Sequence, residues 1–221
     1  MRDWATEQLG NMVTINPSSL RSSHSGIIQY IDISSVERGR LLGYTEHDFA
    51  EAPSRARRII KDGDTIISTV RPNLRAYWRV QGCHENAVAS TGFAVLRAKE
   101  GYDSRFIYYL VTGDSFVDYL ALVAKGTSYP AADTSDFKWA KVATPDLSTQ
   151  TRIADILSAY DDAIENNNRR IALLEKAARQ LYREWFVRMR FPGHESAKFV
   201  GGLPEGWEIV PLDSMVNITS S

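Results

Sequence analysis

The sequence predicts an α+β fold in which a globular domain with a twisted sheet is followed by one long α-helix. Three observations support this class. Short β-rich stretches recur between turn signals early in the chain. Two amphipathic helical stretches follow most of these strands. Residues 148–190 then contain neither Pro nor Gly, which is typical of an uninterrupted helix.

The globular domain is expected to comprise residues 1–147. Its predicted strands are Ile27–Ile33, Thr65–Val70, Phe93–Leu96 and Trp139–Ala143. Before the last of these strands, Ser104 or Asp103 can cap one helix and Asp114 can cap a second. Because the helices gather late instead of alternating with the strands, a doubly wound sheet is not expected.

The long helix is expected over residues 148–190, with Ser148 or Thr149 as its N-cap. Steps of alternately four and three residues along it trace a heptad seam, interrupted near the middle by Asn167. The predicted dimer interface consists of Ile153, Leu157, Tyr160, Ile164, Asn167, Ile171, Leu174 and Leu181. A helix packed on its own domain is the alternative, but globular helices average only ~11–12 residues.

Charge along this helix is polarised, with acidic side chains in its first half and basic side chains in its second half. Two antiparallel copies would set each acidic half against a basic half, whereas parallel copies would place like charges together. A single amide within a seam fixes register and partner orientation. The sequence therefore predicts an antiparallel homodimer held by a coiled coil.

A short pattern near the N-terminus recurs near the C-terminus. The spacing of Trp4, Leu9, Met12, Val13 and Ile15 is repeated by Trp207, Leu212, Met215, Val216 and Ile218. Such self-similarity indicates duplication, although a strand-entry pattern can also arise twice for packing reasons. Residues 191–221 are therefore interpreted as a linker and the start of a second repeat.

The composition of the 221 residues is that of a globular protein, with 43% hydrophobic residues, 24% charged residues and a net charge of −1. Whole-chain charge predicts no nucleic-acid partner, so any basic surface must be local. Cys83 is the single cysteine, and no Cys or His pair has zinc-ligand spacing. No apolar run approaches a membrane span. We expect a cytoplasmic protein with no metal site and no membrane contact.

A local basic segment lies between Ala52 and Arg79, where Arg and Lys greatly outnumber Asp and Glu. Pro72 should bend part of it into a loop. Arg and Asn side chains can read base edges, and Arg or Lys can neutralise phosphates. A second loop at residues 124–130 is small and polar, so its backbone could approach a phosphate. The candidate DNA-binding residues are Arg55, Arg57, Arg58, Lys61, Arg71, Asn73, Arg75, Tyr77, Lys125, Ser128 and Tyr129. The alternative is a solvated basic face with a core Tyr and Trp, beside a plain turn at residues 124–130.

The order of several segments resembles the specificity (S) subunit of type I restriction-modification enzymes, and the resemblance covers the whole chain. The segments that carry it are Asp62–Pro72, Ala89–Arg97, Lys125–Ala131, Pro145–Leu157 and Leu203–Trp207. The resemblance implies that residues 1–147 form a target recognition domain and that Leu203–Trp207 opens a second one. Complete members carry two such domains, whereas this chain stops at Ser221, so a natural half-length subunit and a shortened chain both stay open.

The resemblance also implies partners. Each recognition domain of the family reads one half of a split double-stranded DNA target, and the long helices pair as a spacer. Methylation subunits supply the S-adenosylmethionine chemistry, and a motor-nuclease subunit supplies cleavage. The chain itself is then expected to bind no cofactor and to catalyse nothing, as one subunit of a DNA methyltransferase and restriction endonuclease.

Two catalytic classes of function fit the sequence less well. A DNA methyltransferase needs an Asn/Asp-Pro-Pro-aromatic element, and the nearest match, Asn16-Pro17-Ser18-Ser19, lacks the second Pro and the aromatic. A metal-dependent nuclease needs clustered carboxylates, for which Asp118 and Asp136 are a faint match that turn chemistry explains better. The remaining alternative is a homodimeric coiled-coil scaffold or regulator without sequence-specific DNA binding.

Overall fold

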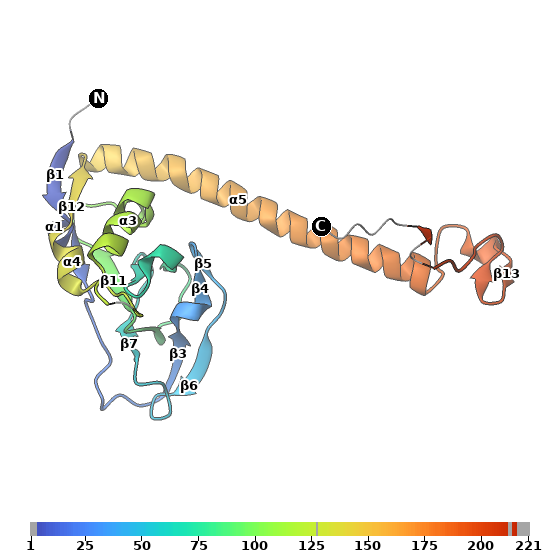
Figure 1. Ribbon diagram of the computed structural model, residues 1–221, viewed down its shortest axis with the longest axis horizontal. Helices are drawn as coiled ribbons and strands as arrows, with labels where there is room; N and C mark the ends of the chain where they lie inside the picture. The colour runs from blue at the N-terminus through green and yellow to red at the C-terminus, as the bar shows by residue number, and fades with distance from the viewer. Residues whose placement is uncertain (1–3, 127, 212–213, 216–221) are drawn as a thin grey trace. The chain divides into compact units, whose positions relative to one another are not determined.

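A computed structural model describes residues 4–126, 128–211 and 214–215 of the chain. The chain divides into two units, one over Met1–Tyr160 and one over Asp161–Ser221. The first unit therefore contains the predicted globular domain, residues 1–147, together with the first turns of the long helix. The α+β class expected from the sequence is confirmed, with sheets in the first unit followed by a long helix (Figure 1).

The first unit contains two four-stranded sheets where the sequence predicted one twisted sheet. Strand order in the first sheet is β6 (Thr45–Asp48), β3 (Ile27–Ile31), β10 (Ala87–Ser90) and β7 (Ala56–Ile59). Strand order in the second is β2 (Val13–Ile15), β11 (Phe93–Ala98), β8 (Thr65–Ser68) and β9 (Tyr77–Arg79). Strands β10 and β11 follow each other in the chain but belong to different sheets, so the turn between them connects the two layers.

Strand β11 shows how alternation builds the cores on either side of its sheet. Phe93 and Val95 lie in a cluster with Ile31 and Ala89 of the first sheet, so this core lies between the two sheets. Ala94 and Leu96 point the other way, because successive side chains of a strand alternate between its faces. This short apolar segment is therefore a central strand of its sheet and is buried on both faces.

Four helices supply the residues that cover the other face of the second sheet (Figure 1). They are α1 (Leu9–Met12), α2 (Ser104–Thr112), α3 (Asp114–Val123) and α4 (Thr134–Trp139). Asp103 caps α2, as expected, through hydrogen bonds from the backbone of Arg105 and Phe106. Asp114 is not the cap of the next helix but its first residue, after Gly113. These helices place their apolar faces in one core with β11.

No single described helix is long and apolar enough to cross a membrane. Only the adjoining pair α2 and α3, among the described helices, reaches that length and composition together, across a 60° bend. Buried apolar side chains of this pair, among them Phe106, Ile107 and Leu120, lie in the core of the first unit.

The N-terminal copy of the repeated pattern closes this core. Strand β1 (Ala5–Gln8) pairs antiparallel with β12 (Lys141–Thr144), and Leu9 and Met12 follow it fully buried. The predicted strand Trp139–Ala143 begins two residues late because Trp139 ends α4. In the second copy, Leu212, Val216 and Ile218 lie outside the described residues, so the structure tests only the first copy.

The Asp62-Gly63-Asp64 segment of the family resemblance serves the fold. The carboxylate of Asp62 accepts the Cys83 backbone N–H at 3.0 Å. Asp64 is only 1% exposed and accepts two hydrogen bonds from the Arg97 guanidinium, at 2.8 and 2.7 Å. Burial raises the pKa of the Cys83 thiol to about 11, with Asp62 adding to the shift, and this partly buried cysteine packs against the core between the two sheets.

The long helix α5 spans Leu147–Tyr182 and continues into a π-helical turn over Arg183–Val187. It was predicted for residues 148–190, with Ser148 or Thr149 as its cap. The cap is instead Asp146, whose backbone carbonyl accepts Gln150 N–H and whose carboxylate accepts Thr149 N–H at 3.0 Å. Hydrogen bonds from the Ser148 hydroxyl and from Thr149 lower the pKa of Asp146 to about 2.

Ile153 was predicted to belong to the dimer interface, but the structure packs it against the core of its own domain. Ala154 beside it is fully buried. Farther along α5 the seam is open, with Tyr160 67% exposed and Leu174 68% exposed. The alternative of a helix packed on its own domain therefore applies to its first turns, and the seam from Tyr160 onward is a solvent-exposed apolar stripe.

Candidate nucleic-acid interface

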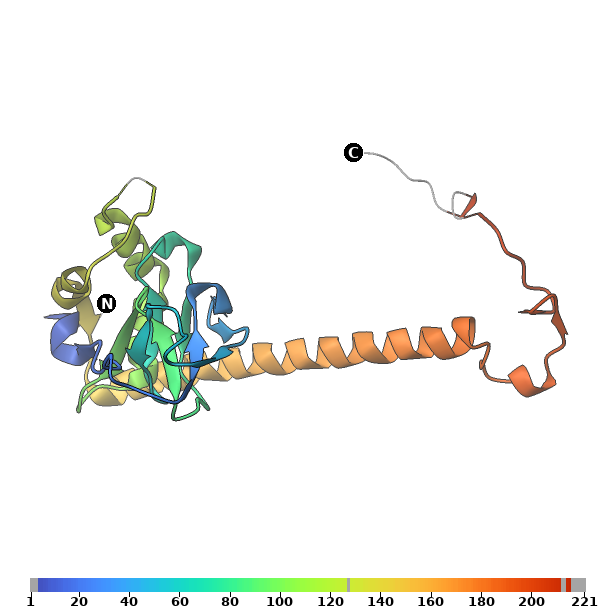
Figure 2. The same cartoon turned by 90° about the horizontal axis from the view of Figure 1, so that it is seen from below.

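Two loops that are far apart in sequence meet at one end of the first unit (Figure 2). Val70 bridges to Ala131, and the Arg71 N–H donates to the Pro130 carbonyl at 2.8 Å. A bridge from Lys125 to Ala131 closes the second loop on itself. Gly126 lies at φ +111°, and a Cβ there would lie 3.0 Å from the Tyr129 carbonyl, so glycine is required at this turn.

The Arg71 side chain joins these loops above their backbone bridge. Its guanidinium carbon lies 4.5 Å from the centroid of the Tyr129 ring, a cation–π contact. One guanidinium nitrogen donates to the Ser128 carbonyl at 3.1 Å. Tyr129 is 68% exposed and Arg71 is exposed as well. These two contacts hold the guanidinium in place. Because a guanidinium has five N–H donors, it can still bind an anion or a base edge.

The Arg71 loop is conformationally strained. Pro72–Leu74 forms a single 3-10 turn, η2, and the residues on both sides of it adopt left-handed backbone angles. These residues are Arg71 at φ 48° and Arg75 at φ 58°. Non-glycine residues rarely adopt this conformation, and such outliers gather at functional sites. The turn leaves Asn73 exposed at its apex.

Arg75 and Tyr77 follow in sequence but are committed to the fold. Arg75 forms an ion pair with Asp114 at 2.6 Å, and this hydrogen bond raises the pKa of the guanidinium. The Tyr77 ring packs edge-on against Tyr108 at 6.2 Å and lies against the helical core. Both residues were predicted as DNA contacts, and in the structure each is partly exposed and has a partner within the domain.

A row of neighbouring turns extends the meeting point of the two loops. Thr91 N–H donates to the Arg55 carbonyl at 2.8 Å, and Thr69 N–H donates to the Gly92 carbonyl at 2.8 Å. Arg55 is thereby linked through two turns to the Arg71 loop. We call this set the loop rim, which consists of Arg55, Thr69, Arg71, Asn73, Thr91, Ser128 and Tyr129.

Three other predicted basic residues, Arg57, Arg58 and Lys61, lie apart from the loop rim, whereas Lys125 lies in the second loop itself. The guanidinium carbon of Arg57 lies 4.7 Å from the centroid of the Phe49 ring. The Arg58 guanidinium donates a hydrogen bond to the Ser19 hydroxyl, and burial lowers the pKa of Arg58. Arg55 precedes β7, whereas Lys61 follows it at its other end and immediately precedes the turn into β8. The Arg71 loop leaves the other end of β8, so four strand residues, ~13 Å, separate the two positions. Lys125 lies in the second loop, 80% exposed and 3.9 Å from Asp133.

Sequence reasoning missed a basic hairpin beside the loop rim. Strands β4 (Val36–Glu37) and β5 (Arg40–Leu41) form it, and exposed Arg38 and Arg40 lie at its turn. Arg38 N–H donates to the Arg75 carbonyl at 3.1 Å, which sets the hairpin next to η2. Gly39 fits there because a Cβ would lie 2.6 Å from the Tyr108 hydroxyl oxygen. In the sequence, the Arg38-Gly39-Arg40 triplet could have indicated this basic turn.

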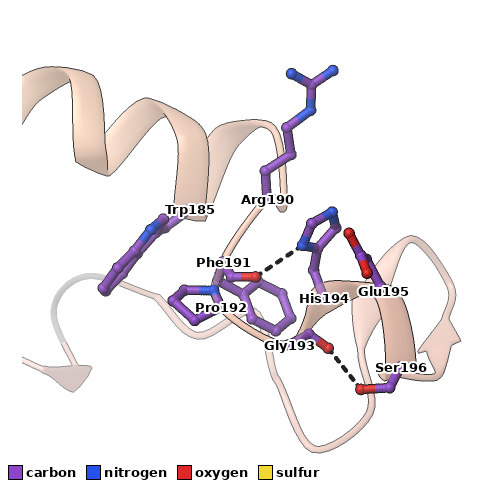
Figure 3. Close-up of a pocket in the computed structure, with 8 residues that line it drawn as sticks. All are labelled: Trp185, Arg190, Phe191, Pro192, Gly193, His194, Glu195 and Ser196. Atoms are coloured by element: carbon purple, nitrogen blue, oxygen red, sulfur yellow. Dashed lines mark hydrogen bonds between the residues drawn. The ribbon is translucent and has the colours of Figure 1, made fainter.

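The second unit contains an open hollow of about 590 Å³ (Figure 3). Trp185 and Phe191 form its apolar side. At its edge, the His194 ring donates to the Phe191 carbonyl at 2.9 Å and the Ser196 hydroxyl donates to the Gly193 carbonyl at 3.0 Å. Arg190, which lies 3.7 Å from the Glu184 carboxylate, and Glu195 also line the hollow. The hollow is open, whereas a small-molecule site usually encloses most of its ligand, so the loop rim is the stronger candidate.

Comparison with known proteins gives consistent matches. Residues 1–176 match the family described as type I restriction modification DNA specificity domain. The MjaIX type I restriction enzyme specificity subunit of Methanocaldococcus jannaschii is 30% identical over 96% of this chain and 46% of that protein. The HindI specificity subunit of Haemophilus influenzae is 26% identical over 85% of this chain and 41% of that protein.

A crystal structure of the HsdS subunit from Thermoanaerobacter tengcongensis has a TM-score of 0.65 with this chain at 27% identity. The match covers 95% of this chain and 52% of that one. The chain thus spans about half the length of the relatives it matches.

Proposed function

Because this chain belongs to the family of type I restriction-modification DNA specificity domains, we propose that it reads one half-site of a split DNA target within such an enzyme. The family assignment rests on the match over residues 1–176. In the proposed role the chain is the non-catalytic recognition subunit, and its work is to bind and orient double-stranded DNA.

The observation that carries this role is the position of Arg71 at the loop rim. Its guanidinium is exposed, oriented by Tyr129 and Ser128, and supported by a strained turn. A pre-positioned Arg loses little freedom on binding, and Arg is the commonest specific reader of guanine in the major groove. Asn73 at the same turn can read adenine. Arg38, Arg40 and Arg55 flank these groups, and we expect them to contact phosphates.

Replacing Arg71 by Ala is expected to weaken binding by about 1–3 kcal/mol and to relax specificity at one base pair. The reason is loss of a bidentate base contact, whereas loss of a phosphate contact would weaken all sequences alike. The measurement is binding competition with a set of single-base variants of the target.

Lys61→Ala is the matched control, because Lys61 is an exposed cation at the far end of β8. Its affinity and specificity should stay at the level of the unmodified protein. Unchanged binding by the triple variant Arg71→Ala, Asn73→Ala and Tyr129→Ala would remove the loop rim from the DNA interface.

We propose further that two copies pair through α5. The seam from Tyr160 to Leu181 exposes Ile164, Ile171 and Leu174 by more than half. Burying each such side chain is worth about 1.5–3 kcal/mol, so pairing has a strong driving force. The acidic first half and basic second half of α5 favour antiparallel packing under twofold symmetry. Two Asn167 amides would then meet near the axis.

An antiparallel pair presents two identical recognition domains. They should read inverted copies of one half-site, roughly a helical turn (~34–36 Å) or more apart. The proposed target is therefore a split palindrome, in contrast to the asymmetric target that two different recognition domains would read.

Methylation subunits are proposed to dock on the faces of α5 outside the seam and on the adjoining sheet, and to bind the S-adenosylmethionine. A motor-nuclease subunit completes the assembly. The purified chain with S-adenosylmethionine is expected to transfer no methyl group to DNA, since the reaction is assigned to the partner. Scintillation counting of labelled DNA measures this.

Electrophoretic mobility shifts with and without a methylation subunit test the assembly. A supershift of the DNA complex supports docking, whereas methyl transfer by the chain alone would contradict the division of labour. A dimer that shifts no DNA under either condition would favour the scaffold alternative.

A further inference from the structure

The first turns of α5 are held to the domain by a polar clamp, which we define as Asp103, Arg105, Gln150 and Asp155. All four lie in the first unit. They connect the start of α2 with the start of α5, two helices whose first residues, Ser104 and Leu147, are more than forty positions apart in the chain. The proposed DNA interface does not use any of them.

Gln150 is the inner part of the clamp. Its side chain is 2% exposed, yet both ends of the amide are bonded. The oxygen accepts the Asp103 N–H at 3.1 Å, and the nitrogen donates to the Pro145 carbonyl at 2.9 Å. A buried amide is costly unless it is hydrogen-bonded, so this geometry opposes rotation or tilt of the helix start.

Arg105 is the outer part. Its guanidinium bridges Asp103 at 3.1 Å and Asp155 at 2.7 Å. The hydrogen bonds that the guanidinium donates to Asp103 and to Asp155 raise the pKa of Arg105. Between the inner and outer contacts, Ala154 is fully buried in the domain core. The helix start is therefore held at three consecutive places, by an amide, by core packing and by an ion pair.

We infer that this clamp sets which distance between half-sites the dimer accepts, with Gln150 and Arg105 as positioning residues. The inference rests on the proposed function. In a dimer joined through α5, the orientation of each recognition domain relative to its partner depends on how each helix is rooted. B-DNA turns about 34° for each base pair, so a root that tilts by tens of degrees would let one domain accept the neighbouring spacing.

Selection from a random duplex library tests the inference, since the library contains every half-site and every short spacing. The full chain is used with its methylation subunit, and enriched DNA is sequenced. The unmodified protein should enrich two inverted half-sites at one spacing. Gln150→Ala and Arg105→Ala should enrich the same half-site at two or more spacings. Discrimination between adjacent spacings should fall by about tenfold, the order of one mismatched base pair.

Asp155→Ala guards against a folding defect, because Asp155 is largely exposed and only the outer bond is lost. It should broaden the spacing less than Arg105→Ala. Asp162→Ala, an exposed acidic position on the same helix outside the clamp, is the matched control. A single unchanged spacing in all clamp variants overturns the inference. Failure of the unmodified protein to enrich any half-site overturns the proposed function instead.

Discussion

Leu174→Asp is expected to convert the protein from a dimer to a monomer. Leu174 lies in the middle of the basic half of α5 and is 68% exposed in the single chain. In the proposed antiparallel pair the Leu174 side chain would be buried. An Asp carboxylate there would lose its hydration without gaining a hydrogen-bonding or ionic partner in the apolar seam. Sedimentation velocity at micromolar concentration measures the change, and recognition of the split palindrome should fall with it.

The neighbouring residue supplies the control. Leu173 is 60% exposed on the same helix but lies one position off the seam. Leu173→Asp should therefore leave the dimer intact, since adjacent positions of a helix point about 100° apart. A dimer that survives Leu174→Asp, or an unmodified protein that sediments as a monomer, would contradict pairing through this stripe.

Arg97→Ala is expected to destabilise the first unit by about 3 kcal/mol, the lower end of the cost of breaking a buried ion pair. The mutation would leave the Asp64 carboxylate, 1% exposed, without its two guanidinium hydrogen bonds. The lower end applies because the Arg97 side chain itself is 30% exposed, so water can replace part of the interaction. Urea unfolding followed by circular dichroism measures the change in midpoint.

A solvent-exposed pair provides the comparison. Arg179 and Glu175 on α5 are 3.0 Å apart, with side chains 76% and 60% exposed. Arg179→Ala should cost at most about 0.5 kcal/mol, as is usual for such helical pairs. If Arg97→Ala proves as mild as Arg179→Ala, the Asp64 pair is not a determinant of stability. Partial recovery in the double variant Arg97→Ala, Asp64→Ala would show that the cost lies in the uncompensated charge.

Local patterns predicted much of the fold because they depend on neighbours in the chain. Apolar runs at Ile27–Ile31, Thr65–Ser68 and Phe93–Ala98 became strands, and the absence of Pro and Gly predicted α5. Division of the strands into two sheets could not be predicted, because a turn that changes layer has no sequence period. Among the strands that were missed, β4, β5 and β6 are two to four residues long and mostly exposed, too short for alternation to show.

The candidate site was predicted only in part. Gly, Pro and Arg composition located both loops, and the structure brings Arg71, Ser128 and Tyr129 together. Composition could not show which cations are available. Asp114 pairs with Arg75, and Arg38 comes beside it through a backbone hydrogen bond between residues that are distant in the sequence.

The sequence by itself determined the elements whose cause is local: the strand and helix periods, the turn at Pro72, and the polarised heptad seam of α5. Only the tertiary structure decided which charges are paired and which apolar residues are covered. Ile153 shows the reason, since it continues the same seam as Ile164 yet packs against its own domain. Burial and charge pairing are properties of the surfaces that meet, and segments distant in sequence supply those surfaces.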